Sequence, residues 1–155
     1  MAEGILRKDG AGRFNAYSAG SHPKGAVNPL AIKVLESFNY PTDGYRSKPW
    51  DEFAGSDAPK MDFVFTVCDS AAGEACPVWP GQPMTAHWGV EDPAAVGGTP
   101  VQKEAAFVTA FRYLRNRITV FTALPMRSIS SMALQTKLRE IGRMEGASSA
   151  SKKAS

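Results

Sequence analysis

A short apolar run in the middle of the chain ends directly on a cysteine and an aspartate. Residues 63–67 read Phe-Val-Phe-Thr-Val, and Cys68 and Asp69 follow at once. A run of this length and composition, bounded by Asp, Pro and Gly, indicates a buried β-strand. Ligands of open parallel α/β sheets bind beyond the carboxyl ends of the strands. Cys68 is therefore a candidate for chemistry and not only for packing.

Helical and strand patterns alternate along the chain. Helices are predicted over residues 1–7, from the Asn28-Pro29 start to residue 38, over residues 107–121 and after Ser128, with a short helical turn at 52–54. Strands are predicted over residues 14–19, 63–67 and 84–87. Strands that alternate with helices imply a parallel sheet covered by helices, so the expected fold class is a three-layer α/β sandwich.

The length and composition describe one globular domain with a polar tail. A chain of 155 residues normally forms a single domain with a real core. From Gly146 onward the chain holds only Gly, Ala, Ser and Lys, residue types that bury too little apolar surface to become ordered. The predicted organisation is a domain over residues 1–144 and a disordered tail over residues 145–155.

The charge balance and hydropathy exclude several classes of partner. The formal charge is 18 − 15 = +3, and it falls to +1 without Lys152 and Lys153, so no basic face for nucleic acid is expected. No apolar stretch approaches the ~18 residues of a membrane span. The first residues contain no apolar signal region, so the predicted location is the cytoplasm, where thiols stay reduced unless they are catalytic or sensing.

The two cysteines and Asp92 each have an ordinary alternative reading. Cys68 and Cys76 are compatible with two small buried apolar side chains. Asp92 precedes a proline, which is typical of a simple turn. His87 precedes Trp88 and is more often half of a packed pair than a catalytic group. The histidines and cysteines lack zinc-site spacing, so no bound metal or cofactor is predicted.

Four segments carry motifs that are specific in combination. They are Ala19-Gly20-x-His22-Pro23, Asn28-Pro29-Leu30, Gly44-Tyr45-Arg46-Ser47-Lys48 and residues 63–94. Together they resemble the low-molecular-weight protein tyrosine phosphatase superfamily, and the likeness covers residues 1–144. Three shorter motifs resemble its arsenate reductase branch: Thr66-Val67-Cys68-Asp69, Cys76-Pro77-Val78-Trp79-Pro80-Gly81 and Ala86-His87-Trp88-Gly89.

The resemblance implies a reductase that passes electrons through thiols. In the family a loop cysteine bonds to arsenate, a second cysteine releases arsenite, and a third attacks the resulting disulfide. Cys68 matches the second cysteine, Cys76 the third, and Asp92 the general acid that precedes a proline. The implied partners are arsenate or a phosphate-like oxyanion and an external reductant of the thioredoxin or glutaredoxin/glutathione type. The spacing from Cys68 to Cys76 is one residue longer than in thioredoxin-coupled enzymes, which leaves the reductant open.

One part of the family pattern does not occur in these 155 residues. The family has a first central strand that leads into a phosphate-binding Cys-x5-Arg loop. The residue six positions after Cys68 is Glu74, and the residue six positions after Cys76 is Gln82, so neither cysteine opens such a loop. The expectation is therefore an N-terminally truncated chain that lacks this strand and is inactive on its own.

Two other functions remain open beside the arsenate reductase. The first is a low-molecular-weight tyrosine phosphatase, a phosphomonoesterase in which Asp92 alone would matter and both cysteines would be incidental. The second is a fragment without catalytic activity. The cysteine pair discriminates between them, because only the reductase needs Cys68 and Cys76 as thiols.

Overall fold

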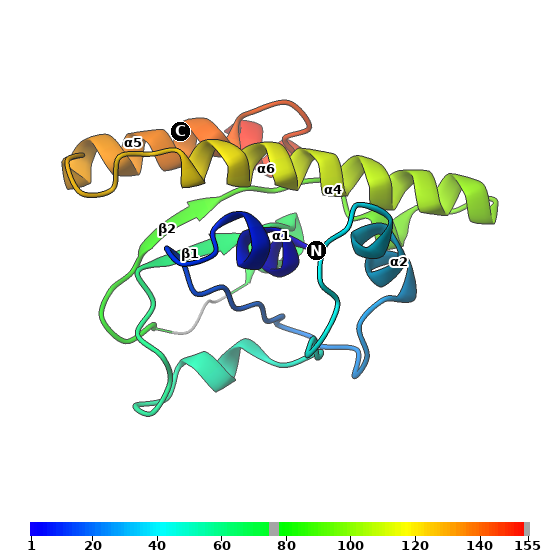
Figure 1. Cartoon of the computed structure of the whole chain (residues 1–155), viewed down its shortest axis with the longest axis horizontal. Coiled ribbons are helices and arrows are strands. Elements are labelled where there is room, and N and C mark those ends of the chain that lie inside the picture. The colour runs from blue at the N-terminus through cyan, green and yellow to red at the C-terminus, as the bar shows by residue number, and fades with distance from the viewer. Residues whose placement is uncertain (75–77, 154–155) are drawn as a thin grey trace.

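The computed structural model describes residues 1–74 and 78–153 (Figure 1). Its α-helices are α1 (Ala2–Asp9), α2 (Pro29–Ser37), α3 (Asp69–Gly73), α4 (Pro100–Thr122), α5 (Ser131–Gly142) and α6 (Ser149–Lys153). Its strands are β1 (Phe63–Thr66) and β2 (Met84–His87), and two 3₁₀ helices are η1 (Trp50–Phe53) and η2 (Pro93–Ala95). None of these helices combines the length and apolar character that crossing a membrane requires.

The helix starts are encoded by their capping residues. The Asn28 side chain accepts a hydrogen bond of 2.9 Å from the Leu30 backbone N–H, and Pro29 occupies the first helical position of α2. Helix α4 begins with a capping box in which Thr99 and Gln102 each satisfy the other's backbone N–H. Helix α2 therefore starts where the sequence predicts, whereas α4 starts at Pro100, ahead of the predicted range of 107–121.

The two strands form a parallel pair that places their carboxyl ends together. In the register of β1 and β2, Phe63 lies opposite Met84 and Thr66 opposite His87. Helix α3 follows β1 in the chain. Helix α5 packs on β2 (Figure 1). Residues that follow the two strands consequently meet at one edge of the sheet.

The core is built around the long helix α4. Phe121 meets four aromatic rings with centroids 5.0–5.6 Å away, namely Phe14, Phe63, Phe65 and Trp88. Figure 1 shows α4 lying across one side of the molecule, and it packs on α1 and α2 as well as on α5. Aromatic side chains bury large apolar areas, so this cluster joins the helices to the sheet.

The predicted α/β class with a parallel sheet is confirmed, but the strand predicted over residues 14–19 is wrong. This segment is irregular, and only an isolated parallel bridge between Gly20 and Pro49 follows it. A strand needs a hydrogen-bonding neighbour, and in the described part of the chain β1 pairs with β2 alone. The alternating pattern of 14–19 instead reflects packing, because Phe14 contacts Phe121 and Tyr17 contacts Phe53.

Residues 145–153 differ from the disordered tail that composition predicts. They turn back onto the domain and end in the short helix α6. Ser148 and Ser151 are each only 2% exposed. Composition misses this arrangement because the serines are buried through hydrogen bonds to the domain rather than through apolar surface.

Candidate functional site

Cys68 lies at the junction of β1 and α3. It is the N-cap residue of α3, with an extended backbone, and its side chain is half-buried. Its sulfur lies 3.5 Å from the Ser70 hydroxyl oxygen. The position beyond the carboxyl end of β1 is the one that the sequence predicts.

Three side chains next to Cys68 form a hydrogen-bonded chain across the ends of both strands. His87 Nδ1 lies 2.7 Å from Thr66 Oγ1, and His87 Nε2 lies 2.8 Å from Asp69 Oδ1. An ionised carboxylate only accepts hydrogen bonds, so His87 Nε2 carries a hydrogen and donates a hydrogen bond to Asp69. The His87 side chain is 12% exposed and the Asp69 side chain is 40% exposed, so the imidazole is largely buried while the carboxylate reaches solvent.

Asp69 is held as a carboxylate by several donors. Burial alone raises the pKa of Asp69, but hydrogen bonds from the Ser148 hydroxyl, from His87 and from the Ala150 backbone N–H outweigh it, and the pKa is lowered. The Ala150 N–H donates to Oδ2 at 3.3 Å, while Ser148 and His87 donate to Oδ1. The residue directly after Cys68 is therefore charged at neutral pH and tied to two distant segments.

Gly89 allows these groups to converge. A Cβ atom on Gly89 would overlap Ser148 Oγ, His87 Nε2 and Asp69 Oδ1. Only a residue without a side chain leaves room for all three contacts. The close packing around Gly89 thus explains why the Ala86-His87-Trp88-Gly89 motif ends in glycine in this chain.

Of the three predicted site residues, the structure describes Cys68 and Asp92. Cys68 lies beside the Asp69–His87 contact, whereas Cys76 falls outside the described residues. Asp92 is exposed at the start of η2, and its Oδ1 accepts a 2.9 Å hydrogen bond from the Ala94 N–H in its own turn. Within the described chain, the hydrogen bond of Asp92 stays in that turn and does not reach the contacts around Cys68.

Sequence reasoning missed Asp69 and Ser148 and undervalued His87. Asp69 and His87 could have been paired, because they stand at and just after the carboxyl ends of two predicted parallel strands. Ser148 offered no signal, because it lies in a stretch of small polar residues. His87 is packed, as predicted, but it also links β1, β2 and α3.

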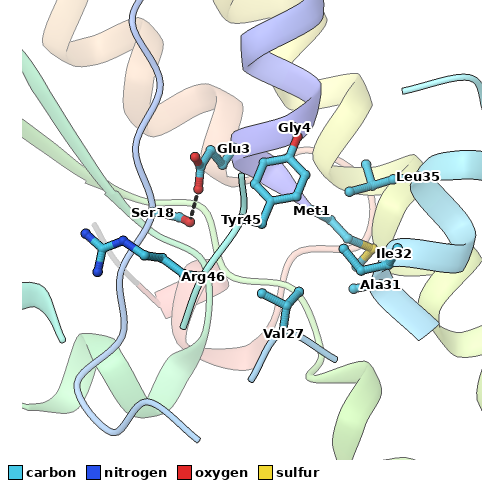
Figure 2. A pocket seen from close by; sticks show the side chains of 10 residues that line it. All are labelled: Met1, Glu3, Gly4, Ser18, Val27, Ala31, Ile32, Leu35, Tyr45 and Arg46. Carbon is cyan, nitrogen blue, oxygen red and sulfur yellow. Dashed lines mark hydrogen bonds between the residues drawn. The ribbon is translucent and has the colours of Figure 1, made fainter. Parts of the chain in front are cut away.

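A separate pocket lies between α1, α2 and the loop at residues 45–46 (Figure 2). Its lining is Met1, Glu3, Gly4, Ser18, Val27, Ala31, Ile32, Leu35, Tyr45 and Arg46. Figure 2 shows the Ser18 hydroxyl donating to the Glu3 carboxylate. Neither Cys68 nor Asp92 lines this pocket.

The two charged side chains that line this pocket, Glu3 and Arg46, are each paired with a residue outside the lining. Glu3 accepts from Arg7, and the Lys48 ammonium lies 3.9 Å from the other Glu3 oxygen, with both Glu3 and Lys48 side chains 8% exposed. Arg46 donates to Glu52 at 2.8 Å through one nitrogen and also bonds the second carboxylate oxygen. The loop predicted to lie near an anion site thus contributes Arg46 to the lining, with its guanidinium already engaged. No group of three or more metal-ligating side chains gathers anywhere in residues 1–74 and 78–153.

Comparison with known proteins identifies the class to which this fold belongs. The low molecular weight phosphotyrosine protein phosphatase family matches residues 1–123. The chain belongs to this family. Residues 124–153, which include α5 and α6, lie beyond the matched span.

Within this family, the chain is similar to proteins described as arsenate reductases. An arsenate reductase of Oceanobacillus iheyensis is 35% identical over 121 residues, which cover 78% of this chain and 84% of that protein. An arsenate reductase of Bacillus subtilis is 32% identical with the same coverage. A solved structure described as an arsenate reductase in reduced state matches with a TM-score of 0.54 and 24% identity over 79% of this chain and 85% of that one. At that identity the solved structure supports the fold alone.

Proposed function

We propose that this chain supplies the second and third thiols of an arsenate reductase, Cys68 and Cys76, with Asp92 as the proton donor. The observation that carries the proposal is the place of Cys68, beyond the carboxyl end of β1 and at the start of α3. Curated relatives that are 32–35% identical are arsenate reductases, which supports the substrate. The implied partners are arsenate and a thioredoxin- or glutaredoxin-type dithiol, in a compartment that keeps thiols reduced.

The proposed relay moves two electrons from thiols to arsenic. A loop-cysteine thiolate first replaces a hydroxyl group on arsenate, and Asp92 protonates the departing oxygen. The Cys68 thiolate then attacks that loop sulfur, forming a disulfide while the electron pair leaves with arsenic as arsenite. Cys76 next attacks the Cys68 sulfur, so the loop thiolate is released and a Cys68–Cys76 disulfide remains. An external dithiol reduces this disulfide by the same exchange.

The first step needs a group that these 155 residues do not encode. An oxyanion is held by a nest of backbone N–H groups and an arginine at a Cys-x5-Arg loop. Glu74 and Gln82 occupy the arginine positions counted from the two cysteines. We therefore expect the chain alone to be inactive on arsenate. The three-layer form of the domain over residues 1–144 would be completed by a strand that carries the loop.

The test supplies that loop and then removes one thiol. A strand and Cys-x5-Arg loop of the family are joined ahead of Met1, and arsenite release and p-nitrophenyl phosphate hydrolysis are measured with and without Cys76→Ser. The reductase proposal predicts that Cys76→Ser abolishes arsenite turnover and keeps phosphatase activity. Equal loss of both activities, or loss of neither, contradicts the relay. Phosphatase activity without arsenite turnover in the unsubstituted protein would favour the phosphomonoesterase, for which Cys76 is incidental.

A further inference from the structure

The two residues that follow Cys68 offer opposite groups to its sulfur. Asp69 carries a carboxylate, and Ser70 carries a hydroxyl. A nearby negative charge disfavours a thiolate, whereas a hydrogen-bond donor favours it. The thiolate, not the thiol, is the nucleophile. These two neighbours therefore bear directly on the attack proposed for Cys68.

The Asp69 carboxylate is bound by groups other than Cys68. His87 Nε2 lies 2.8 Å from Asp69 Oδ1, and the Ser148 hydroxyl donates to the same oxygen. The Ala150 N–H donates to Oδ2 at 3.3 Å. Donors from β2 and from residues 148–150 thus satisfy both carboxylate oxygens. The negative charge next to Cys68 is held by these donors and not left to the sulfur.

The Ser70 hydroxyl, in contrast, lies against the sulfur. Cys68 is the N-cap residue of α3, and an N-cap side chain faces the residues of the first helical turn, to which Ser70 belongs. Cys68 Sγ and Ser70 Oγ are 3.5 Å apart. A hydroxyl both donates and accepts, whereas a thiolate only accepts, so ionisation of Cys68 makes Ser70 the donor.

We propose that Ser70 is a positioning residue for Cys68: its hydroxyl donates a hydrogen bond to the Cys68 sulfur and favours the attacking thiolate. This inference rests on the proposed function, since it takes Cys68 as a nucleophile of the relay. It needs only residues that the structure describes. In the run Cys68-Asp69-Ser70, the carboxylate anchors the start of α3, and the hydroxyl serves the sulfur.

Alkylation by iodoacetamide measures the Cys68 thiolate without arsenate. The sulfur forms a bond to the reagent's carbon, the carbon–iodine bond breaks, iodide leaves, and the thiol proton passes to the buffer. The chain has two cysteines, so a Cys76→Ser parent keeps Cys68 as its sole thiol. Mass spectrometry of the intact protein gives the rate constant at pH 7 and at about pH 10, where an ordinary cysteine thiol is ionised.

Ser70→Ala is expected to slow alkylation at pH 7 about fivefold, because water replaces only part of the lost hydrogen bond. The rate at about pH 10 should stay nearly unchanged, since there the thiolate forms without help. A change in access to the sulfur would instead alter both rates equally. Ser131→Ala is the matched control, because it removes an exposed serine hydroxyl from the first turn of another helix, α5.

A pair of isosteric variants isolates the hydroxyl. Ser70→Thr keeps the donor and should react within about twofold of the parent, whereas Ser70→Val has the shape of threonine without the donor and should be slow at pH 7. This pair also replaces Ser70→Ala if that variant does not fold. The other charged groups around α3 are unchanged in every Ser70 variant: Asp69, His87, the Glu74–His22 pair at 3.5 Å, and Lys152 and Lys153 of α6, which packs on α3.

A double variant separates a direct effect on the sulfur from one through the carboxylate. If Ser70 acts on Cys68 directly, Ser70→Ala slows alkylation by the same factor in an Asp69→Asn background. Loss of the effect in that background overturns the proposal, as do equal rates of Ser70→Ala and its parent at pH 7 or equal slowing at both pH values. Arsenite release tests the relay separately. Absence of turnover in the extended protein, with the Ser70 effect intact, removes the proposed function and leaves the Ser70 contact standing.

Discussion

Large apolar rings make the buried contacts around Phe121, whereas serine hydroxyls and backbone groups make those of residues 147–151, here called the strap. The Phe121 ring is 1% exposed and lies within 5.6 Å of four other aromatic rings. Ser148 is 2% exposed, yet it is held by hydrogen bonds to Gly89 and Asp69. The same degree of burial therefore stabilises the two regions differently. A hydrogen bond contributes only a modest net free energy, whereas burial of an aromatic ring contributes a large one.

This difference separates a fixed part of the molecule from one that can open locally. Local opening has a low free energy where few apolar contacts are lost. The strap and α3 fit that description, and they flank Cys68. The aromatic core is therefore expected to stay protected when the strap opens.

The largest expected effect is that of Phe121→Ala, which leaves a cavity among four aromatic rings. The free energy of unfolding should fall by about 3–5 kcal/mol. Urea unfolding followed by circular dichroism measures it. Val120→Ala is the control, because Val120 is 40% exposed on the same helix. Equal losses for the two variants would mean that the aromatic cluster does not dominate the core.

Gly89→Ala should rank second and should release the strap. Its new methyl group overlaps three polar atoms that cannot all move without losing contacts, at a cost of about 1–3 kcal/mol. Hydrogen exchange of residues 148–151 should accelerate far more than exchange in α4. Gly97→Ala is the control, because nothing lies within 4 Å of its added Cβ. Unchanged protection of the strap in Gly89→Ala would refute the convergence around Asp69.

Trp88→Phe should have a smaller effect, confined to the attachment of α5. The variant loses the donor to the Leu138 carbonyl but keeps an aromatic ring to stack on Phe65, so about 0.5–1.5 kcal/mol is expected. Trp50→Phe in η1 is the control, because it makes the same substitution away from α5. Chemical denaturation and exchange of α5 amides measure both. A loss as large as that of Phe121→Ala would show that Trp88 matters mainly as core.

The smallest expected effect is the acid titration of Asp69. Its pKa is lowered in the folded state, so its contribution to stability is complete above the unfolded value and disappears as the pH falls through the folded value. The hydrogen bond between His87 and this carboxylate favours its ionised form. The Asp69 carboxyl carbon, followed by NMR, should titrate below the ordinary range of an aspartate, together with the Ala150 amide. A midpoint at or above that of an unstructured aspartate would contradict the contacts described.

The periodic and capped elements were predictable because their signals are local. The spacing of Phe107, Phe111 and Phe121 specifies α4, and Asn28-Pro29 specifies the start of α2. The place of Cys68 after a buried strand follows from a short apolar run. Each of these needs only neighbouring residues in the sequence.

The remaining features depend on contacts between distant segments. The pattern at 14–19 does not reveal whether a neighbouring strand is available to pair with it. Ser148 lies 79 residues from Asp69, and a run of glycine, alanine, serine and lysine carries no hint of that contact. The assignments of Cys68, Cys76 and Asp92 to the relay stay predictions, and Cys76 lies outside the described residues.

Arsenite release with a thioredoxin system tests the central claim most directly, measured on the 155-residue protein and on the same protein with a family Cys-x5-Arg segment joined ahead of Met1. The account predicts background release from the first and turnover, dependent on Cys68 and Cys76, from the second. Turnover by the 155-residue protein itself would contradict it. So would turnover in the extended protein that survives replacement of both cysteines.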